Sequence, residues 1–267
     1  MNICLNGRWL VTKASDYDTL RREYAPGADT LIVNGHSRPW QTAMREGDEV
    51  LMFSSSERPS PALWRAIYNA RYGKNIMDQL QTGRVAICGL GGLGSLAAIE
   101  LARLGVGELL LIDGDRVDAT NLARQQYRFD QIGQLKTAAL AETIAGTAPL
   151  THIKTASVWL DKENIVPLLN DWPIICECLD RPESKALLTN TVLSSLPDAT
   201  LVAASGMAGY GSGNAITSKQ LLPHFYLVGD EVSEGEEGIG LMAPRVGLCA
   251  SAQATLIMRL LLGETTP

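Results

Sequence analysis

Cysteine is scarce in this 267-residue sequence, and no two cysteines have the Cys-x-x-Cys spacing that tetrahedral zinc sites use. Their number is odd and their intervals are irregular, so a disulfide framework is not expected: Cys4, Cys88, Cys176, Cys178 and Cys249. The opening residues, MNICLNGRWL, also lack the pattern of a secretory signal peptide. We therefore expect a protein of the reducing cytoplasm.

Basic charge and long apolar runs are lacking as well. Lys and Arg total 23 against 29 Asp and Glu, so no sequence-wide basic field is available for a nucleic-acid backbone. The longest uncharged stretch, between Asp198 and Lys219, is interrupted by glycines, and the helical run 246–258 is too short to span a bilayer. Nucleic acid and membranes are therefore not expected as partners, although 46% hydrophobic residues can build substantial cores.

The first sixty residues predict a small α/β module with the order ββαβββ. Strand pairs surround Asn6-Gly7 and Asn34-Gly35, the dipeptides most typical of tight hairpins. Asp16 can cap a helix that ends before Pro26-Gly27, and EVLMF closes the module as a last strand. A helix laid across a small mixed sheet is the expected fold, followed by a linker over 54–61.

From Ala62 onward the pattern becomes helical and then alternates between strands and helices. After a helix broken near Gly73, RVAICGL predicts a buried strand, the next fifteen residues a helix ending at Gly105, and ELLLID a second strand. Apolar runs and helical stretches continue to alternate up to a last helix over 245–262. This rhythm predicts a doubly wound, mainly parallel sheet. The expected domains are 1–58 and 62–267.

A glycine-rich turn joins the first strand of this sheet to its helix. Such a turn brings backbone N–H groups and a helix N-terminus to a phosphate, and its residues here are Gly89, Gly91, Gly92, Gly94 and Ser95. Asp113 ends the next strand, 19 residues after Gly94, where a carboxylate can accept both ribose hydroxyls. NAD, another nucleotide and a structural turn all stay open on this pattern alone.

The segment after the second strand gathers cations, carboxylates and amides where ligands bind in such sheets: Asp113, Asp115, Asn121, Arg124, Gln125 and Lys136. Two cations beside a phosphate-binding turn suit a triphosphate under attack, because they can neutralise charge that develops on the α-phosphate and the leaving pyrophosphate. A hydride-transfer site has no such need. The alternative is that Arg124 and Lys136 are solvated surface charges.

Residues 68–264 resemble the ThiF/MoeB/HesA adenylyltransferases. The resemblance is carried by RYGKN, GLGGLGS, LIDGDxVxxxNLxRQ, IGQLK, the strand end CLD and the segment MAPRVGLCASAQA. It implies that Asp113 holds the ribose, that Arg124 and Lys136 bind phosphates, and that Asp180 serves Mg²⁺ or the reacting centre; a helix cap is the alternative for Asp180. The family's arginine in the RYGKN segment, which can reach a partner subunit's ATP site, falls on Lys74, and a homodimer is implied.

The N-terminal module resembles ThiS, a ubiquitin-like sulfur carrier, in MNICLNG, TLIVNG and EGDEVLMF. A carrier needs a free Gly-Gly end whose carboxylate reacts, but this module runs into Ser54-Ser55-Ser56. We therefore expect it to be a docking, oligomerisation or occluding element and not the cargo.

The chain departs from many relatives in its cysteines. It has no zinc-binding Cys-x-x-Cys pairs, and residues 224–247 resemble the zinc-free branch of ThiF-like proteins, so zinc is not expected. Cys88 and Cys249 lie in apolar segments, which disfavours a catalytic thiol. The glycine-rich stretch 205–213 is either an ordinary loop or a surface along which a Gly-Gly tail can lie.

The expected activity is adenylylation of the C-terminal carboxylate of a separate ThiS-like carrier with ATP and Mg²⁺, in thiamine biosynthesis. One rival is an NAD-dependent oxidoreductase, which leaves Arg124 and Lys136 unexplained. A second is a non-catalytic ATP-binding protein whose fused module occupies the groove. A third, activation of a tRNA carboxylate, is disfavoured by the acidic charge.

Overall fold

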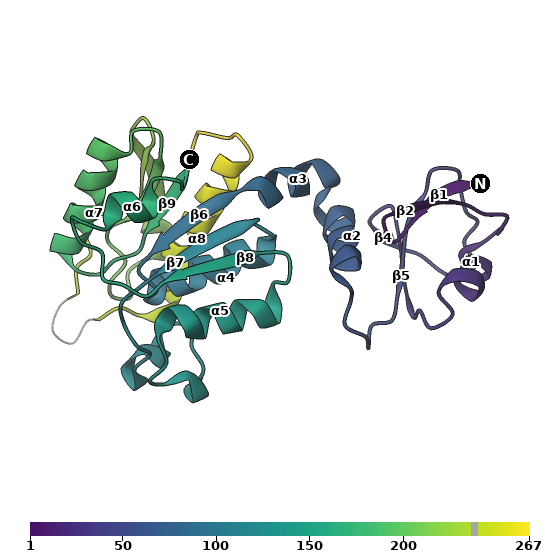
Figure 1. Ribbon diagram of the computed structural model, residues 1–267, viewed down its shortest axis with the longest axis horizontal. Helices are drawn as coiled ribbons and strands as arrows, with labels where there is room; N and C mark the ends of the chain where they lie inside the picture. Colours follow the sequence, from purple (N-terminus) through teal and green to yellow (C-terminus); the bar gives the residue numbers. More distant parts are fainter. Residues whose placement is uncertain (236–239) are drawn as a thin grey trace. The chain divides into compact units, whose positions relative to one another are not determined.

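The computed structural model describes residues 1–235 and 240–267, and these form two compact units, Met1–Asp78 and Gln79–Pro267 (Figure 1). Each unit has its own sheet and its own hydrophobic core. Residues 230–237 form an acidic run in the sequence, and the last two of them lie outside the described part. The domain limits 1–58 and 62–267 stay a prediction.

The sheet of the first unit is small and mixed, as the hairpin signals predicted. Its strand order is β2-β1-β5-β3-β4, with β1 and β5 parallel and the other neighbours antiparallel. The Asp16 carboxylate accepts the Thr19 N–H at 2.8 Å and so caps the helix. The elements are β1 (Asn2–Leu5), β2 (Arg8–Val11), α1 (Tyr17–Tyr24), β3 (Thr30–Val33), β4 (His36–Ser37) and β5 (Glu49–Phe53).

A second helix, α2 (Pro61–Tyr72), belongs to this first unit and contacts β5. Along β5, Val50 and Met52 enter the core that the sheet forms with α1. Leu51 faces the opposite way and is buried too, and Ala66 of α2 is 8% exposed. The small sheet is therefore covered by helices on both faces. The next helix, α3 (Lys74–Thr82), runs across the boundary between the units.

The segment after β5 is attached to the module itself. The Asp29 carboxylate accepts the Ser55 N–H at 2.8 Å and the Ser55 hydroxyl at 2.7 Å. Ser60 then caps α2 by accepting the Leu63 N–H. The chain beyond the last strand is thus held by side chains of its own unit and does not leave as a free tail.

The second unit contains the doubly wound sheet that the sequence predicted. The order of its described strands is β11-β12-β10-β9-β6-β7-β8, with all neighbours parallel except β11 and β12. The parallel strands are β6 (Arg84–Cys88), β7 (Glu108–Ile112), β8 (His152–Ala156), β9 (Ile174–Glu177), β10 (Thr200–Ala204) and β12 (Phe225–Gly229). Their order is that of a dinucleotide-binding fold, and the crevice expected at its reversal lies beside β6.

Helices cover both faces of this sheet (Figure 1). Helices α4 (Gly92–Leu104), α5 (Lys136–Thr147) and α8 (Ala243–Leu261) build one core with the alternate strand residues Val85 and Ile87. Ala86 and Cys88 face the other core, which holds α6 (Ile165–Leu169) and α7 (Pro182–Ser195). Because both faces of the inner strands are buried, β6, β7, β9 and β10 read as mainly apolar runs in the sequence.

Two strands were not predicted: β11 (Thr217–Leu222) and β12. Strand β11 is an antiparallel edge strand whose side chains are mostly exposed, so it lacks the alternation of a half-buried strand.

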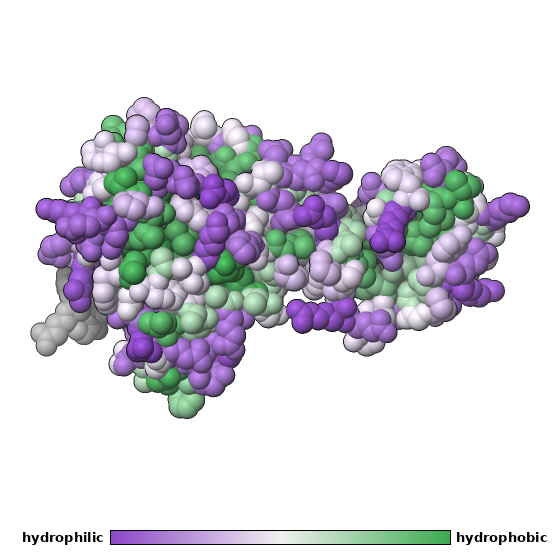
Figure 2. All heavy atoms as spheres, viewed as in Figure 1, coloured by the Kyte–Doolittle hydropathy of each residue, from purple (hydrophilic) through white to green (hydrophobic). Residues whose placement is uncertain are grey.

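Polar residues cover most of the face shown in Figure 2, with hydrophobic residues gathered in separate patches on each unit. Among the described helices, none combines the length and apolarity needed to cross a bilayer.

Candidate active site

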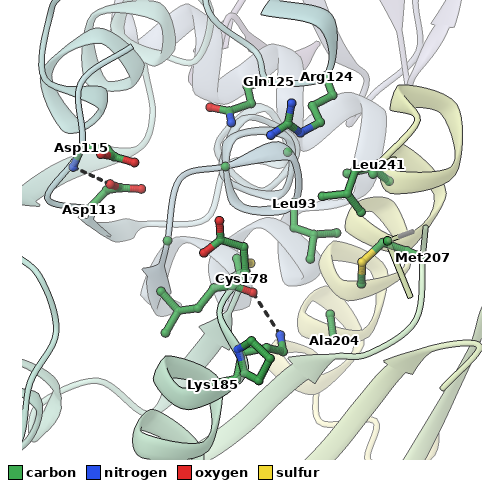
Figure 3. Close-up of a pocket in the computed structure, with 18 of the residues that line it drawn as sticks. Leu93, Asp113, Asp115, Arg124, Gln125, Cys178, Lys185, Ala204, Met207 and Leu241 are labelled. Atoms are coloured by element: carbon green, nitrogen blue, oxygen red, sulfur yellow. Dashed lines mark hydrogen bonds between the residues drawn. The ribbon is translucent and has the colours of Figure 1, made fainter. Parts of the chain in front are cut away.

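A cavity of about 590 Å³ opens at the carboxyl edge of the large sheet. The loops that follow β6, β7, β8, β9, β10 and β12 all contribute to its wall. Its lining is mixed, with apolar side chains beside carboxylates, amides and cations (Figure 3). Ligands bind at this edge in doubly wound sheets, so this cavity is the candidate active site.

The glycine-rich turn forms one wall, at the N-terminus of α4. A Cβ added to Gly94 would stand 1.9 Å from the Gly89 carbonyl oxygen, so only glycine lets the helix start this close to the strand end. Gly89, Gly91 and Gly92 line the cavity. The first N–H groups of a helix have no acceptor within it and carry the positive end of its dipole, which suits an anion.

Asp113 joins this turn to the end of β7. Its carboxylate accepts the Leu90 N–H and the Asp115 N–H, both at 2.7 Å. Each carboxylate oxygen still has a second lone pair, so the group can also accept from a ligand hydroxyl. Asp113 therefore positions the glycine turn and faces the cavity at once.

Arg124 and Gln125 lie next to each other above the glycine turn (Figure 3). The Cγ atom of Arg124 would be 3.7 Å from a Cβ on Gly92, so its side chain runs along the start of α4. Gln125 is 7% exposed, and its amide oxygen has no hydrogen-bond partner among the described residues. A buried polar atom without a partner is costly, and a ligand in the cavity can supply one.

Lys136, the first residue of α5, is buried, with 7% of its side chain exposed. Its Nζ lies 3.0 Å from the Asp115 carboxylate, which is half exposed at the cavity. The Asp115 carbonyl also accepts the Lys136 N–H. This ion pair holds the Lys136 ammonium group at the cavity wall. A bound ligand can contact the ammonium by replacing the Asp115 carboxylate or by binding beside it.

A second ion pair, at the cavity floor, was not predicted. Glu177, at the end of β9, is fully buried, and Lys185 Nζ donates to its two oxygens at 2.9 and 2.7 Å. Lys185 also donates to the Leu179 carbonyl (Figure 3), and the Leu179 N–H donates to Glu177. These bonds fix the turn that presents Asp180. A glutamate in the otherwise apolar strand IICE was the available signal.

Asp180 is exposed and lines the cavity from this turn. Its alternative interpretation as a helix cap is wrong, because α7 begins at Pro182 with Arg181 at the N-cap position and no side-chain cap. The carboxylate is thus available to the cavity.

A further unpredicted pair, Arg245 and Asp230, holds two loops together. The Arg245 guanidinium donates to the Asp230 carboxylate and to the Ala208 carbonyl, and both ionised side chains are nearly buried. Burial raises the pKa of Asp230, but hydrogen bonds from Ser233, Val232 and Arg245 outweigh it and hold the pKa well below its usual range. Ser205, Gly206, Met207 and Ala208, from the glycine-rich stretch, line the cavity here. An arginine inside the apolar last helix was the sequence signal.

The cysteines of the second unit are buried thiols. Cys176 and Cys178 have their sulfurs 3.5 Å apart, and Cys178 lines the cavity. A hydrogen bond with Cys176 and burial raise the pKa of Cys178, and burial raises that of Cys249 to about 12. Thiols of this kind are poor nucleophiles near neutral pH.

Most of the predicted site residues meet at this cavity: Gly89, Gly91, Gly92, Asp113, Asp115, Arg124, Gln125, Lys136 and Asp180. The others have structural partners. Gly94 packs against Gly89, the Ser95 hydroxyl accepts the Gln126 N–H, and Asn121 accepts the Asp118 N–H in a capping box. Lys74 lies in the first unit and pairs with Asp78. The individual roles of all these residues stay predictions.

Each of the two parts of the chain matches the sequence model of a known protein family. The sequence model of the ThiF family matches residues 64–267, and that of the ThiS-like ubiquitin proteins matches residues 1–54. The chain belongs to the ThiF family. Both resemblances drawn from the sequence motifs are thereby confirmed.

Curated ThiF-family relatives include two enzymes named adenylyltransferase and sulfurtransferase. UBA4 of Candida glabrata is 28% identical over 73% of this chain and 48% of its own length. MOCS3 of Caenorhabditis briggsae is 30% identical over 71% of this chain and 48% of its own length. The chain thus spans about half the length of the curated relatives it matches.

Solved structures show the same fold at low sequence identity. The E. coli tRNA N6-threonylcarbamoyladenosine dehydratase TcdA, solved in complex with ATP, has a TM-score of 0.69 at 20% identity and covers 78% of this chain and 98% of its own. E. coli MccB, solved with ATP, has a TM-score of 0.56 at 20% identity over 75% of this chain and 61% of its own. These likenesses support the predicted fold class.

Proposed function

We propose that this ThiF-family chain adenylylates the C-terminal glycine carboxylate of a separate ubiquitin-like sulfur carrier. A carboxylate oxygen of the carrier attacks the α-phosphorus of ATP, the bond to the β-phosphate oxygen breaks, and pyrophosphate leaves. The observation that carries this proposal is the meeting of the glycine turn, Arg124, Lys136 and Asp180 around one cavity. The activity named for the curated relatives agrees with it.

Catalysis on this proposal is positional and electrostatic. Carboxylate and triphosphate are both anionic, so holding them in line requires donors and cations that offset their repulsion. The N–H groups at the start of α4 bind phosphate, and Arg124 neutralises the charge that grows toward the leaving pyrophosphate. Lys136 exchanges its contact with Asp115 for a phosphate oxygen. No protein nucleophile is required, in keeping with the raised thiol pKa values.

The donors present fit a magnesium ion shared with the substrate. Among the described residues no group of three metal-ligating side chains is found, so a resident all-protein site is not expected there. Mg²⁺ in nucleotide enzymes keeps several waters and uses one or two carboxylates plus substrate phosphates. Asp180, exposed in the cavity, would hold it, and the ion would supply charge neutralisation on the phosphates.

The carrier tail would enter along residues 205–208. Ser205, Gly206 and Ala208 are small, Met207 lies between them, and Arg245 holds this stretch through the Ala208 carbonyl. The small side chains at 205, 206 and 208 leave room for an extended Gly-Gly tail close to the backbone. We propose thiamine biosynthesis as the pathway, which the ThiS-like character of the first unit supports, and the cytoplasm as the compartment.

The first unit is proposed to support the fold or assembly of the protein and not to act as cargo. Its chain beyond β5 is held by Asp29 and continues into α2, so it offers no free carboxylate. In a homodimer, Lys74 would serve the partner's ATP site as a simple cation, without the bidentate fork of an arginine.

Exchange of ³²P-labelled pyrophosphate into ATP, measured with and without a carrier that ends in Gly-Gly, tests the activity. We expect exchange that requires both the carrier and Mg²⁺. Normal ATP binding without carrier-dependent exchange would contradict the adenylyltransferase and favour the non-catalytic rival. Thermal stabilisation by NAD but not by ATP would favour the oxidoreductase.

A further inference from the structure

The indole of Trp159 is an unusual feature of the cavity mouth. The side chain is 62% exposed, yet it lines the cavity from the loop after β8. A Cβ on Gly114 would come within 2.7 Å of the Trp159 ring, so the indole lies directly on the residue that follows Asp113. Asn164 donates to the Trp159 carbonyl at 2.8 Å and steadies the backbone of the loop.

The order of the strands indicates which part of a bound nucleotide the indole of Trp159 would contact. Strands β6, β7 and β8 are neighbours in the sheet, and their loops supply the glycine turn, Asp113 and Trp159 in that spatial order. A nucleoside triphosphate with its phosphates at the glycine turn and its ribose at Asp113 extends its base toward the third loop. Val158 and Leu160, on either side of Trp159, also line this part of the cavity.

We propose that Trp159 stacks on the base of the bound nucleotide, an inference that rests on the proposed use of ATP. Every base offers a π-face, and stacking on an aromatic side chain contributes to affinity without reading hydrogen-bond groups. Trp159 therefore selects a nucleotide over a base-free phosphate chain, while the glycine turn and Arg124 bind the phosphates that both share.

Titration calorimetry and intrinsic fluorescence of the full-length chain test this. ATP should quench the wild-type fluorescence, and Trp159→Phe should abolish the quenching while keeping a smaller stacking ring. Trp159→Ala should weaken ATP binding by about 5- to 150-fold, the range of base–aromatic stacking. Because Trp159 is largely exposed, neither variant should impair folding.

Two comparisons isolate the base. Trp9→Phe, which replaces an indole that is also 62% exposed but lies in the first unit, should leave quenching and affinity unchanged. Inorganic tripolyphosphate, which has no base, should bind wild type and Trp159→Ala equally and without quenching. Equal weakening of ATP and tripolyphosphate would overturn the stacking role, because it would indicate general damage to the site.

The failure of this inference is distinguishable from failure of the proposed function. Wild-type exchange activity together with unchanged ATP affinity in Trp159→Ala would overturn the stacking role alone. A wild-type chain that binds no ATP would overturn both.

Discussion

Buried polar side chains differ between the small sheet and the edge of the large sheet in whether they have hydrogen-bond partners. In the first unit, the buried Asp48 carboxylate accepts from the Tyr17 hydroxyl at 2.6 Å, the Asn34 amide at 2.9 Å and the Arg45 N–H at 2.7 Å. At the cavity, the buried amide oxygen of Gln125 has no such partner in the described structure. The first kind of group stabilises the fold, and the second leaves binding capacity for a ligand.

The same contrast exists inside the second unit at different depths. The buried Glu177 carboxylate is paired with Lys185, whereas Asp180, three residues after Glu177, is exposed at the cavity. A polar residue is therefore best assigned to folding or to function by whether its hydrogen bonds are complete within the chain. The predictions below test this assignment, beginning with the largest expected effect.

Two truncations test what the first unit contributes to folding, to assembly and to ATP binding. Removing residues 1–58 leaves α2 without the sheet that covers it, so we expect most of the protein to aggregate. Removing residues 1–78 takes the whole first unit away, and soluble monomer that still binds ATP would limit the role of this unit to assembly. Light scattering, oligomer mass and ATP titration measure the outcome. A soluble 59–267 fragment with a lowered Michaelis constant for the carrier would instead identify the module as an occluding element, since a tether raises its local concentration.

Replacing Arg124 by alanine should reduce pyrophosphate exchange by about 100- to 1,000-fold, because this cation is proposed to act mainly on transition-state charge. The thermal midpoint should stay near wild type. Arg128→Ala is the matched control, since Arg128 pairs with Asp130 and Glu142 at the surface and should leave exchange unchanged. Wild-type exchange in Arg124→Ala would place the phosphate-neutralising group elsewhere.

Replacing Asp48 by alanine should lower the free energy of unfolding of the first unit by about 2–4 kcal/mol, because three donors lose a buried charged acceptor. ATP affinity should not change. Asp18→Ala is the control: its partners Arg21 and Arg22 lie at the surface, so its loss should lower the free energy of unfolding much less than Asp48→Ala does. Chemical denaturation followed by circular dichroism checks both, and equal losses would refute the distinction by burial.

Replacing Asp113 by alanine should raise the Michaelis constant for ATP about tenfold and change turnover little, because ribose contacts are equal in the ground and transition states. The variant also removes the acceptor for the Leu90 N–H, so Asp113→Asn, which keeps one carbonyl oxygen, should lie between it and wild type. Steady-state exchange kinetics across ATP concentrations decide this. A large fall in turnover at saturating ATP would contradict the ribose role.

Lowering the pH should destabilise both units by a small amount that can be assigned to two carboxylates. Burial raises the pKa values of Asp48 and Asp230, but their hydrogen bonds outweigh it and lower both pKa values overall. Such carboxylates stabilise the folded state fully above the unfolded pKa of about 3.9 and lose that contribution as pH falls below it. Thermal midpoints between pH 6 and 3 should drop by a few degrees more in wild type than in Asp48→Asn. A parallel drop in both would refute the contribution of Asp48.

Much of this structure is readable in the sequence because the signals are local. The Asn-Gly turns, the Asp16 cap and the apolar strands predicted the element order, and the site residues that follow β6 and β7 lie in continuous motifs. Strand β11 was missed because an exposed edge strand needs no apolar face. Arg245 and Lys185 were missed because their roles depend on Asp230 and Glu177, which only the fold brings to them. Trp159 gave no pattern at all.

The parallel arrangement of the strands also bears on how such a site can diversify. Each strand ends in its own loop at the cavity wall, and each loop carries a separate part of the chemistry. A substitution or insertion in one loop leaves the cores on the two faces of the sheet intact. Evolution or protein engineering can therefore exchange the loop after β10, which we propose to face the carrier tail, or the loop after β8, which we propose to face the base. The glycine turn after β6, proposed to bind phosphate, would be inherited unchanged.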